Sequence, residues 1–253
     1  MTKTRLLAAV LAMMGTVLLV SVTALDGGPS ARSRKADKII KKHIEALGGF
    51  KNIKALKTLR IRGRLEREGF EFPFTLWMER PNHTRMDIDV GGQRFVQAYN
   101  GKTAWWVNPL LGAFEPQEMP KEFAKSTLRW VDFEGPLVDY KKKRHKVEYL
   151  RDVDSTNGTA HVLKLFLAGG DVWHVYIDTD TYLEVKRTYQ ETFKGATREV
   201  TAHFPDYSQV EGVNMYRMID GEGIDGTRYT MTFDSIDPNV TIEENWFDMP
   251  EGD

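Results

Sequence analysis

Apolar and polar residues alternate between residues 70 and 79, in the segment FEFPFTLWME. The residues of one parity are all large and apolar: Phe70, Phe72, Phe74, Leu76 and Met78. Because successive side chains of a strand point to opposite faces, this period of two predicts a strand with one strongly apolar face. A second alternating run has Met86, Ile88 and Val90 on its apolar parity and predicts a partner strand.

Short turn signals separate these strands from their neighbours. Arg80-Pro81-Asn82 ends the first strand, since proline cannot donate to a strand ladder and biases the residue before it toward an extended backbone. Gly91-Gly92 and Asn100-Gly101 supply two more turns, with strands predicted at residues 94–99 and 103–107. The region is therefore expected to be an antiparallel meander with one apolar side.

Helical spacing precedes this meander. Ile40, Ile44 and Leu47 recur at the spacing of a helix over residues 36–47, and Gly48-Gly49 supplies its end. A short helical turn is expected at residues 53–56. Between them and the meander, residues 58–66 alternate apolar residues with arginines and predict a further strand.

The helical pattern returns after residue 115. The residues at helical spacing are Met119, Phe123, Thr127 and Trp130. With Pro120 suited to a first turn, they predict a helix over residues 120–131, and Gly135-Pro136 ends it. A short turn at residues 137–143 follows. A helical insertion thus interrupts a β-rich chain.

From residue 147 onward the strand pattern resumes between turn-rich separators. The predicted strands are residues 147–153, 160–167, 172–178, 183–193, 198–207, 214–220 and 227–236. Together with the first five, they make roughly a dozen antiparallel strands at the spacing of sandwiches and barrels. We find no internal repeat and no linker, so the sequence predicts a mainly β (α+β) fold in one domain, residues 36–253, after a flexible lead-in at residues 25–35.

Residues 1–24 have the features of an export signal: basic residues, an uncharged run from Leu6 to Val22, and small residues ending at Ala24. The uncharged run is long for a cleaved signal, so the alternative interpretation is an uncleaved membrane anchor. The chain contains no cysteine, which excludes disulfides, thiolate metal sites, cysteine nucleophiles and a lipid-accepting cysteine. A net charge of −1 lacks the excess of positive charge that is typical of proteins that bind nucleic acid.

Three motifs occur in order along the chain: LWMERPN at residues 76–82, NGKTAW at residues 100–105 with Asn108-Pro109 close behind, and FDMPEG at residues 247–252. With the segment DFEGPLVDY at residues 132–140, they resemble the outer-membrane lipoprotein-sorting family, the LolA-type periplasmic carriers. Asn100 stands where the family commonly has aspartate, which leaves the identity of the cargo open.

The resemblance implies an incomplete antiparallel β-barrel of about 11 strands, with helices closing its mouth over an apolar cavity. In the family this cavity shelters the acyl chains of lipoproteins. The family's arginine in the Arg-Pro-Asn motif, implicated in contacts between barrel and lid helices, maps onto Arg80.

The apolar strand face and the helix over residues 120–131 are the candidate ligand site. The expected lining of the acyl-chain cavity is Phe70, Phe72, Phe74, Leu76, Met78, Met86, Ile88, Phe123 and Trp130. The alternative is an ordinary core, because small barrels fill with their own side chains. The basic run Lys141, Lys142, Lys143 and Arg144 is a candidate docking site for lipid head groups or an acidic partner, or else a solvated end of an element.

Nothing in the sequence indicates catalysis or a cofactor. The six histidines lack a metal-ligand spacing, and no nucleophile elbow or phosphate-binding glycine loop occurs.

The leading hypothesis is a monomeric, non-enzymatic periplasmic carrier of a Gram-negative bacterium. It would take a lipidated protein or lipid from an inner-membrane donor toward an outer-membrane receptor. The alternative is an envelope-stress sensor on the same fold that binds a membrane anti-sigma factor, and a third possibility is an enzyme on this fold.

Overall fold

A computed structural model describes residues 30–155, 158–193, 195–223 and 225–251. The expected export signal, residues 1–24, lies outside the described residues. Within the described part the chain forms fifteen strands, three α-helices and one short 3-10 helix. No helix in these residues is long and apolar enough to cross a membrane.

Thirteen of the described strands form one antiparallel sheet, in the order β6-β5-β4-β3-β2-β1-β15-β14-β11-β10-β9-β8-β7. The first wall comprises β1 (Thr58–Arg67), β2 (Phe70–Glu79), β3 (His83–Val90), β4 (Gln93–Asn100), β5 (Ala104–Asn108) and β6 (Ala113–Glu118). The second wall comprises β7 (Lys146–Ser155), β8 (Gly158–Phe166), β9 (Val172–Asp178), β10 (Glu184–Phe193) and β11 (Ala196–His203). The strands β14 (Met218–Glu222) and β15 (Arg228–Pro238) join the two walls. The strands β6 and β7 stay unpaired with each other, so the sheet is an open barrel.

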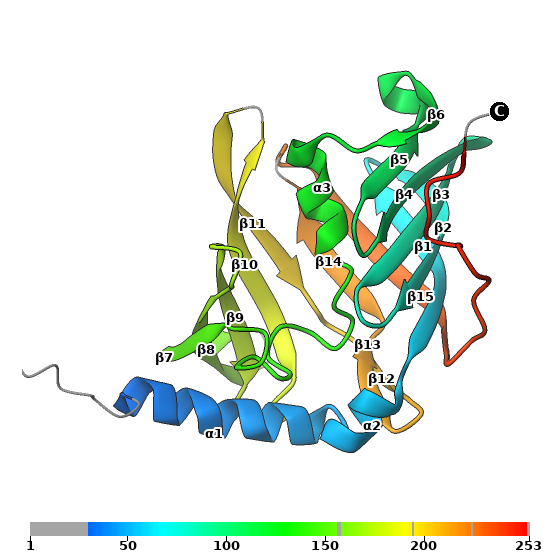
Figure 1. The fold of residues 1–253 in the computed structure, drawn as a ribbon. Helices are drawn as coiled ribbons and strands as arrows, with labels where there is room; N and C mark the ends of the chain where they lie inside the picture. The colour runs from blue at the N-terminus through cyan, green and yellow to red at the C-terminus, as the bar shows by residue number, and fades with distance from the viewer. Residues whose placement is uncertain (1–29, 156–157, 194, 224, 252–253) are drawn as a thin grey trace, which may run out of the picture.

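Of the remaining elements, the three α-helices and one hairpin lie between or below the walls (Figure 1). The helix α1 (Ala31–Ala46) runs across one end of the molecule and continues into α2 (Phe50–Ala55). The hairpin β12 (Tyr207–Val210) and β13 (Val213–Tyr216) lies near α2, and α3 (Lys121–Leu128) lies between the walls. The 3-10 helix η1 (Pro109–Leu111) connects β5 to β6.

Helix α1 begins at Ala31 rather than at residue 36, so residues 31–35 of the expected flexible lead-in are helical. The reason is a cap: the Ser33 amide donates to Ser30 Oγ at 3.1 Å, which satisfies one of the free amides at the helix start. The helix ends before Gly48, whose backbone has φ of 108°, and a Cβ there would lie 1.9 Å from the Gly212 carbonyl oxygen. Only glycine permits this close approach.

The strand count exceeds both expectations, about 11 from the resemblance and roughly a dozen from the pattern. The strand β6 was missed because its sequence AFEPQE contains a proline and shows no sustained alternation. Two longer predicted strands are also interrupted, because β12 and β13 form a separate hairpin turning at Glu211 and Gly212, both with positive φ. Helix α3 is shorter than predicted, ending at Leu128.

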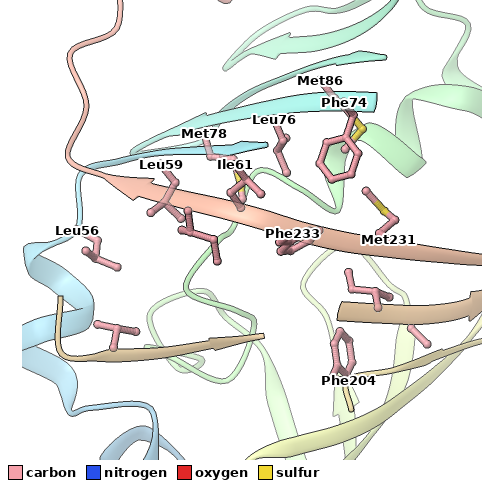
Figure 2. Packing of buried hydrophobic residues seen from close by; sticks show 14 of the residues in the cluster. Leu56, Leu59, Ile61, Phe74, Leu76, Met78, Met86, Phe204, Met231 and Phe233 are labelled. Atoms are coloured by element: carbon pink, nitrogen blue, oxygen red, sulfur yellow. The ribbon is translucent and has the colours of Figure 1, made fainter. Parts of the chain in front are cut away.

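The predicted apolar face of β2 lies on the inner side of the sheet. Phe74, Leu76 and Met78 are buried, and Figure 2 shows Phe74 and Leu76 in the same interior space as Met231 and Phe233 of β15. The Phe74 and Phe233 rings pack edge to face with centroids 5.9 Å apart. The interior beside Phe74 and Leu76 is therefore a filled core.

Candidate functional site

A cavity of about 510 Å³ lies between the two walls and shares lining residues such as Ile61, Met78 and Phe233 with the filled core. It is bounded by α1, α2, the hairpin β12–β13, the end of α3 and the segment that follows α3. Its hydrophobic and aromatic lining includes Leu47, Ile53, Leu56, Ile61, Met78, Leu128, Val131, Phe133, Leu137, Leu167, Trp173, Val213, Met215, Tyr216, Phe233 and Ile236. A volume in this range is typical of small-molecule sites.

The segment after α3, residues 129–145, closes one side of this cavity, and we call it the covering segment. Arg80 ties it to the barrel: Nη1 donates to Glu134 Oε2 at 2.6 Å. The same guanidinium donates to the carbonyl oxygens of Leu56 at 2.8 Å and Ile53 at 3.0 Å, at the end of α2. The last carbonyl groups of a helix have no amide donor within the helix itself, and Arg80 supplies one to α2. The same side chain therefore caps α2 and connects it to the covering segment. The Phe133 ring lies 4.6 Å from the guanidinium.

Glu134 is the centre of a wider ionic network. Lys54 Nζ donates to both of its carboxylate oxygens at 2.8 Å and pairs with Asp139 at 2.9 Å. Lys143 Nζ lies 3.0 Å from Glu134 and 2.7 Å from Asp132. Burial alone would raise the pKa of Glu134, but hydrogen bonds and charges of these cations outweigh it and lower the pKa to about 2. The carboxylate therefore stays ionised at neutral pH, and the network holds the covering segment in place. We call this network, formed by Arg80, Lys54 and Lys143 with Asp132, Glu134 and Asp139, the latch.

The far wall of the cavity carries a buried ion pair. Arg187 donates to the two carboxylate oxygens of Glu184 through Nε and Nη2, both at 2.8 Å. The rings of Trp173 and Phe204 lie 4.8 Å and 5.2 Å from the guanidinium. Tyr207 donates its hydroxyl to the Glu184 carbonyl oxygen at 2.8 Å. Paired and packed between aromatic rings, the Arg187 side chain is held in one orientation.

The sequence gives no signal for this pair. In a regular strand, residues three apart point to opposite faces. A register shift in β10 between Glu184 and Lys186 breaks the alternation, and both Glu184 and Arg187 face the cavity.

The predicted cavity residues are spread over several places. All five of Phe74, Leu76, Met78, Met86 and Ile88 belong to the filled core, and Met78 alone of them also lines the cavity. Phe72 packs at the edge of that core, and Phe70, at the outer end of β2, is 67% exposed.

The two predicted residues around α3 also pack on other side chains. Phe123 lies against Trp106 of the first wall, with ring centroids 4.9 Å apart. Trp130 is partly buried against the filled core. The nearby cavity lining instead comes from Leu128 and residues of the covering segment.

The basic run divides into surface and interior residues. The side chains of Lys141 and Lys142 are 70% and 78% exposed, and Arg144 is also exposed. Lys143 turns inward, with its side chain 22% exposed, and belongs to the latch. Lys141 and Lys142, with Phe50, line a surface groove of about 610 Å³ beside α1 and α2.

The three sequence motifs meet on the outer face of the first wall. Trp105 Nε1 donates to the Phe247 carbonyl oxygen at 2.8 Å, and the Asn100 amide donates to Asp248 at 2.7 Å. Gly101 has φ of 87°, and a Cβ there would lie 3.1 Å from His83. The C-terminal motif therefore straps the sheet on its outer side. Its role in this structure is to hold the first wall together.

Metal chemistry finds no support among the described residues, where no group of three or more His, Asp or Glu side chains could hold an ion.

No protein-family model and no curated protein matches this chain. Solved structures do resemble it. A DUF1329 family protein from Desulfovibrio piger superposes with a TM-score of 0.60 at 9% identity, over 83% of this chain and 96% of its own. A LolA superfamily protein from Nitrosomonas europaea gives a TM-score of 0.56 at 12% identity, over 84% and 96%.

A putative outer-membrane lipoprotein-sorting protein domain from Vibrio parahaemolyticus gives a TM-score of 0.54 at 13% identity, over 85% of this chain and 97% of that chain. Identities this low show the fold alone. The resemblance to LolA-type proteins, predicted from the motifs, is confirmed at the level of the fold.

Proposed function

We propose that the protein is a carrier in the periplasm of a Gram-negative bacterium, which shelters the acyl chains of a lipoprotein or another lipid during transfer toward the outer membrane. The observation that carries the proposal is the cavity of about 510 Å³ with its largely hydrophobic lining. The fold shared with a LolA superfamily protein and a putative lipoprotein-sorting domain supports it. The role requires no cofactor and no covalent chemistry.

The cavity volume sets the capacity of the carrier. A methylene group occupies about as much space as a water molecule, about 30 Å³. A cavity of about 510 Å³ then holds one acyl chain of about sixteen carbons. Such a chain in water carries a penalty of roughly 12 kcal/mol, at about 0.8 kcal/mol per methylene. A cargo with two or three chains needs a wider space, which displacement of the covering segment would create.

The latch is the proposed gate. Arg80 contacts α2 and the covering segment at once, so breaking its bond to Glu134 frees one side of the cavity. A carrier must release as well as bind, and a polar latch between two elements can be shifted by a partner that competes for its charges.

The exposed end of the basic run is the proposed docking site. Lys141, Lys142 and Arg144 offer cations to an acidic surface of a donor complex, an outer-membrane receptor or a membrane, each worth about 1 kcal/mol near anionic lipid. Because Lys143 follows directly and belongs to the latch, docking here would act on the gate.

Native mass spectrometry tests the carrier function. The protein would be exported in a Gram-negative host, purified without detergent, and analysed together with its lipid extract. We expect a bound acylated species. Met215→Glu places a charge in the cavity lining and should abolish binding. The matched control, Leu111→Glu, introduces the same charge at a residue 60% exposed, outside the cavity, and should keep the lipid.

A clean apo mass for the wild-type protein, with no uptake when lipoprotein or phospholipid is offered, would contradict the carrier function. Co-purification of a membrane-bound regulator in place of lipid would favour the sensor hypothesis.

A further inference from the structure

The charged groups that line the cavity are balanced. Its acidic and basic residues form ion pairs: Lys125 with Asp171 at 2.7 Å, Arg129 with Glu191 at 2.7 Å, Arg187 with Glu184 at 2.8 Å, and Asp132 and Glu134 with the cations of the latch. Burial lowers the pKa values of the lining histidines His43 and His145, which favours their neutral forms. An anionic ligand would therefore meet no surplus of positive charge.

Two hydrogen-bond donors in this balanced cavity remain open. Arg187 uses Nε and Nη2 on Glu184, and its Nη1 donates to no residue that the structure describes. The Tyr216 hydroxyl likewise has no hydrogen-bond partner within the described part of the chain. Neither atom is among the fully buried unpaired polar atoms, and both residues line the cavity. Both groups are thus accessible from the cavity.

The side chains that carry the two donors pack against the same aromatic ring. The Phe204 ring lies 5.2 Å from the Arg187 guanidinium and 5.0 Å from the Tyr216 ring centroid. The Tyr216 ring also packs against Phe233 at 5.6 Å and Tyr207 at 6.2 Å, which fixes its position. Burial raises the pKa of Tyr216, so its hydroxyl keeps the proton that it can donate.

We propose that Arg187 Nη1 and Tyr216 Oη form a polar subsite that recognises the ester carbonyl of an uncharged acyl-ester group, while the hydrocarbon chain fills the apolar remainder of the cavity. This inference deepens the proposed carrier function and rests on it. A carbonyl oxygen has two lone pairs and accepts from both donors. A free carboxylate fits less well, because Glu184 already pairs with Arg187 and balances its charge.

The subsite gives the carrier selectivity between acyl esters and other hydrocarbon chains. An alkane would leave the two donors unpaired after displacing the water around them, which carries a cost. An ether lacks the carbonyl oxygen and offers the two donors only its single ether oxygen at another position. Ester groups of this kind occur in acylglycerols, in phospholipids and in diacylglyceryl-modified proteins. Their shared chemistry is the ester carbonyl.

Calorimetric titration with three matched C12 probes tests the subsite: monolauroyl glycerol, its ether analogue 1-O-dodecyl glycerol, and laurate. We expect the wild-type protein to bind the ester about tenfold tighter than the ether, as one or two hydrogen bonds would give. Tyr216→Phe should reduce this ratio to about threefold or less, chiefly by weakening the binding of the ester.

Arg187→Lys keeps the charge opposite Glu184 but loses the planar fork, and it should also lower the ratio. This second variant keeps the test valid if Tyr216→Phe does not fold. The matched control is Tyr229→Phe, because Tyr229 is partly buried and lies outside the cavity lining. It should keep the wild-type ratio.

The outcomes separate the two proposals. Equal affinity of the wild-type protein for ester and ether overturns the subsite and leaves the carrier function standing. Tighter binding of laurate than of the ester overturns the inference of an uncharged ligand. Failure of all three probes, and of native lipid, to bind overturns the carrier function itself.

Discussion

The interior of the barrel differs between its two walls, although both face the same enclosed space. Next to the first wall, apolar side chains fill the interior: Leu76 is fully buried and Phe74 packs on Phe233. Next to the second wall, Arg187 and Tyr216 border a cavity of about 510 Å³. One curved sheet thus supports a packed core beside Phe74 and Leu76 and a hollow that reaches the second wall, with Ile61, Met78 and Phe233 bordering both.

The difference shows how a small barrel can stay open. Apolar side chains choose among rotamers and interdigitate until little space is left. Arg187 cannot move into the space, because it would have to leave Glu184 and the flanking rings of Trp173 and Phe204. Breaking a buried ion pair costs several kcal/mol. The paired side chains of Arg187 and Glu184 therefore keep their positions, and the cavity beside them stays unfilled by protein side chains.

The largest expected difference between the two regions is in the loss of unfolding free energy when a leucine is truncated to alanine. Leu76→Ala removes a side chain with 0% exposure from the filled core and should lower the free energy of unfolding by about 2–5 kcal/mol. Leu47→Ala at the half-buried cavity lining should cost only about 1 kcal/mol, since less packing is lost. Urea denaturation of both variants measures the difference. Equal losses would mean that the cavity side is as densely packed as the core.

The second largest effect is expected from acid, which should protonate Glu134 and weaken the ion pairs of the latch. The folded-state pKa of Glu134 is about 2, below the ordinary 4.5, so its ion pairs stabilise the protein above about pH 4.5 and that stability is lost as pH falls toward 2. The loss amounts to about 3 kcal/mol as an upper limit. Other carboxylates titrate in the same range, so the comparison must be made with Glu134→Gln.

The Glu134→Gln variant should be less stable at pH 7 and should lose less stability between pH 4.5 and 2 than the wild-type protein. Denaturation at several pH values measures both. Parallel pH profiles for the two proteins would show that Glu134 does not hold the covering segment through its charge.

The smallest expected effect on stability comes from His43, a residue of α1 whose side chain lines the cavity. Burial outweighs its hydrogen bond to the Tyr182 carbonyl oxygen and lowers its pKa below 6.5. The unfolded state therefore binds a proton that the folded state excludes, and stability should fall as pH drops below 6.5. His43→Asn keeps a donor for Tyr182 and should flatten this part of the profile. An unchanged slope would assign the effect to the other histidines.

Local patterns predicted the elements of the first wall well. The parity of β2 correctly placed Phe74, Leu76 and Met78 on the inner face, because a strand with one buried face must alternate. The turn at Asn100-Gly101 and the helix ended by Gly48 were likewise predicted from residues with special backbone freedom. The strand β6 and the hairpin β12–β13 were missed because short strands with proline or weak alternation carry little local signal.

The cavity lining could not be predicted in the same way. Met78 and Leu76 share one parity of one strand and one buried cluster, yet Met78 also borders the cavity and Leu76 does not. What separates them is the packing of distant segments, which no pattern within the strand describes. The bulge in β10 likewise turned Glu184 and Arg187 to one face against the regular alternation.

The sequence by itself determined most strands of the two walls, the apolar face of β2 and many of the turns, because these properties depend on residues a few positions apart. Only the tertiary structure decided where the interior is filled and where it is hollow. It also decided which cations meet Glu134 and which donors stay open beside Arg187. Those properties depend on how separate elements, such as α2, β2, β10 and the covering segment, share a volume, and volume is not encoded in any local period.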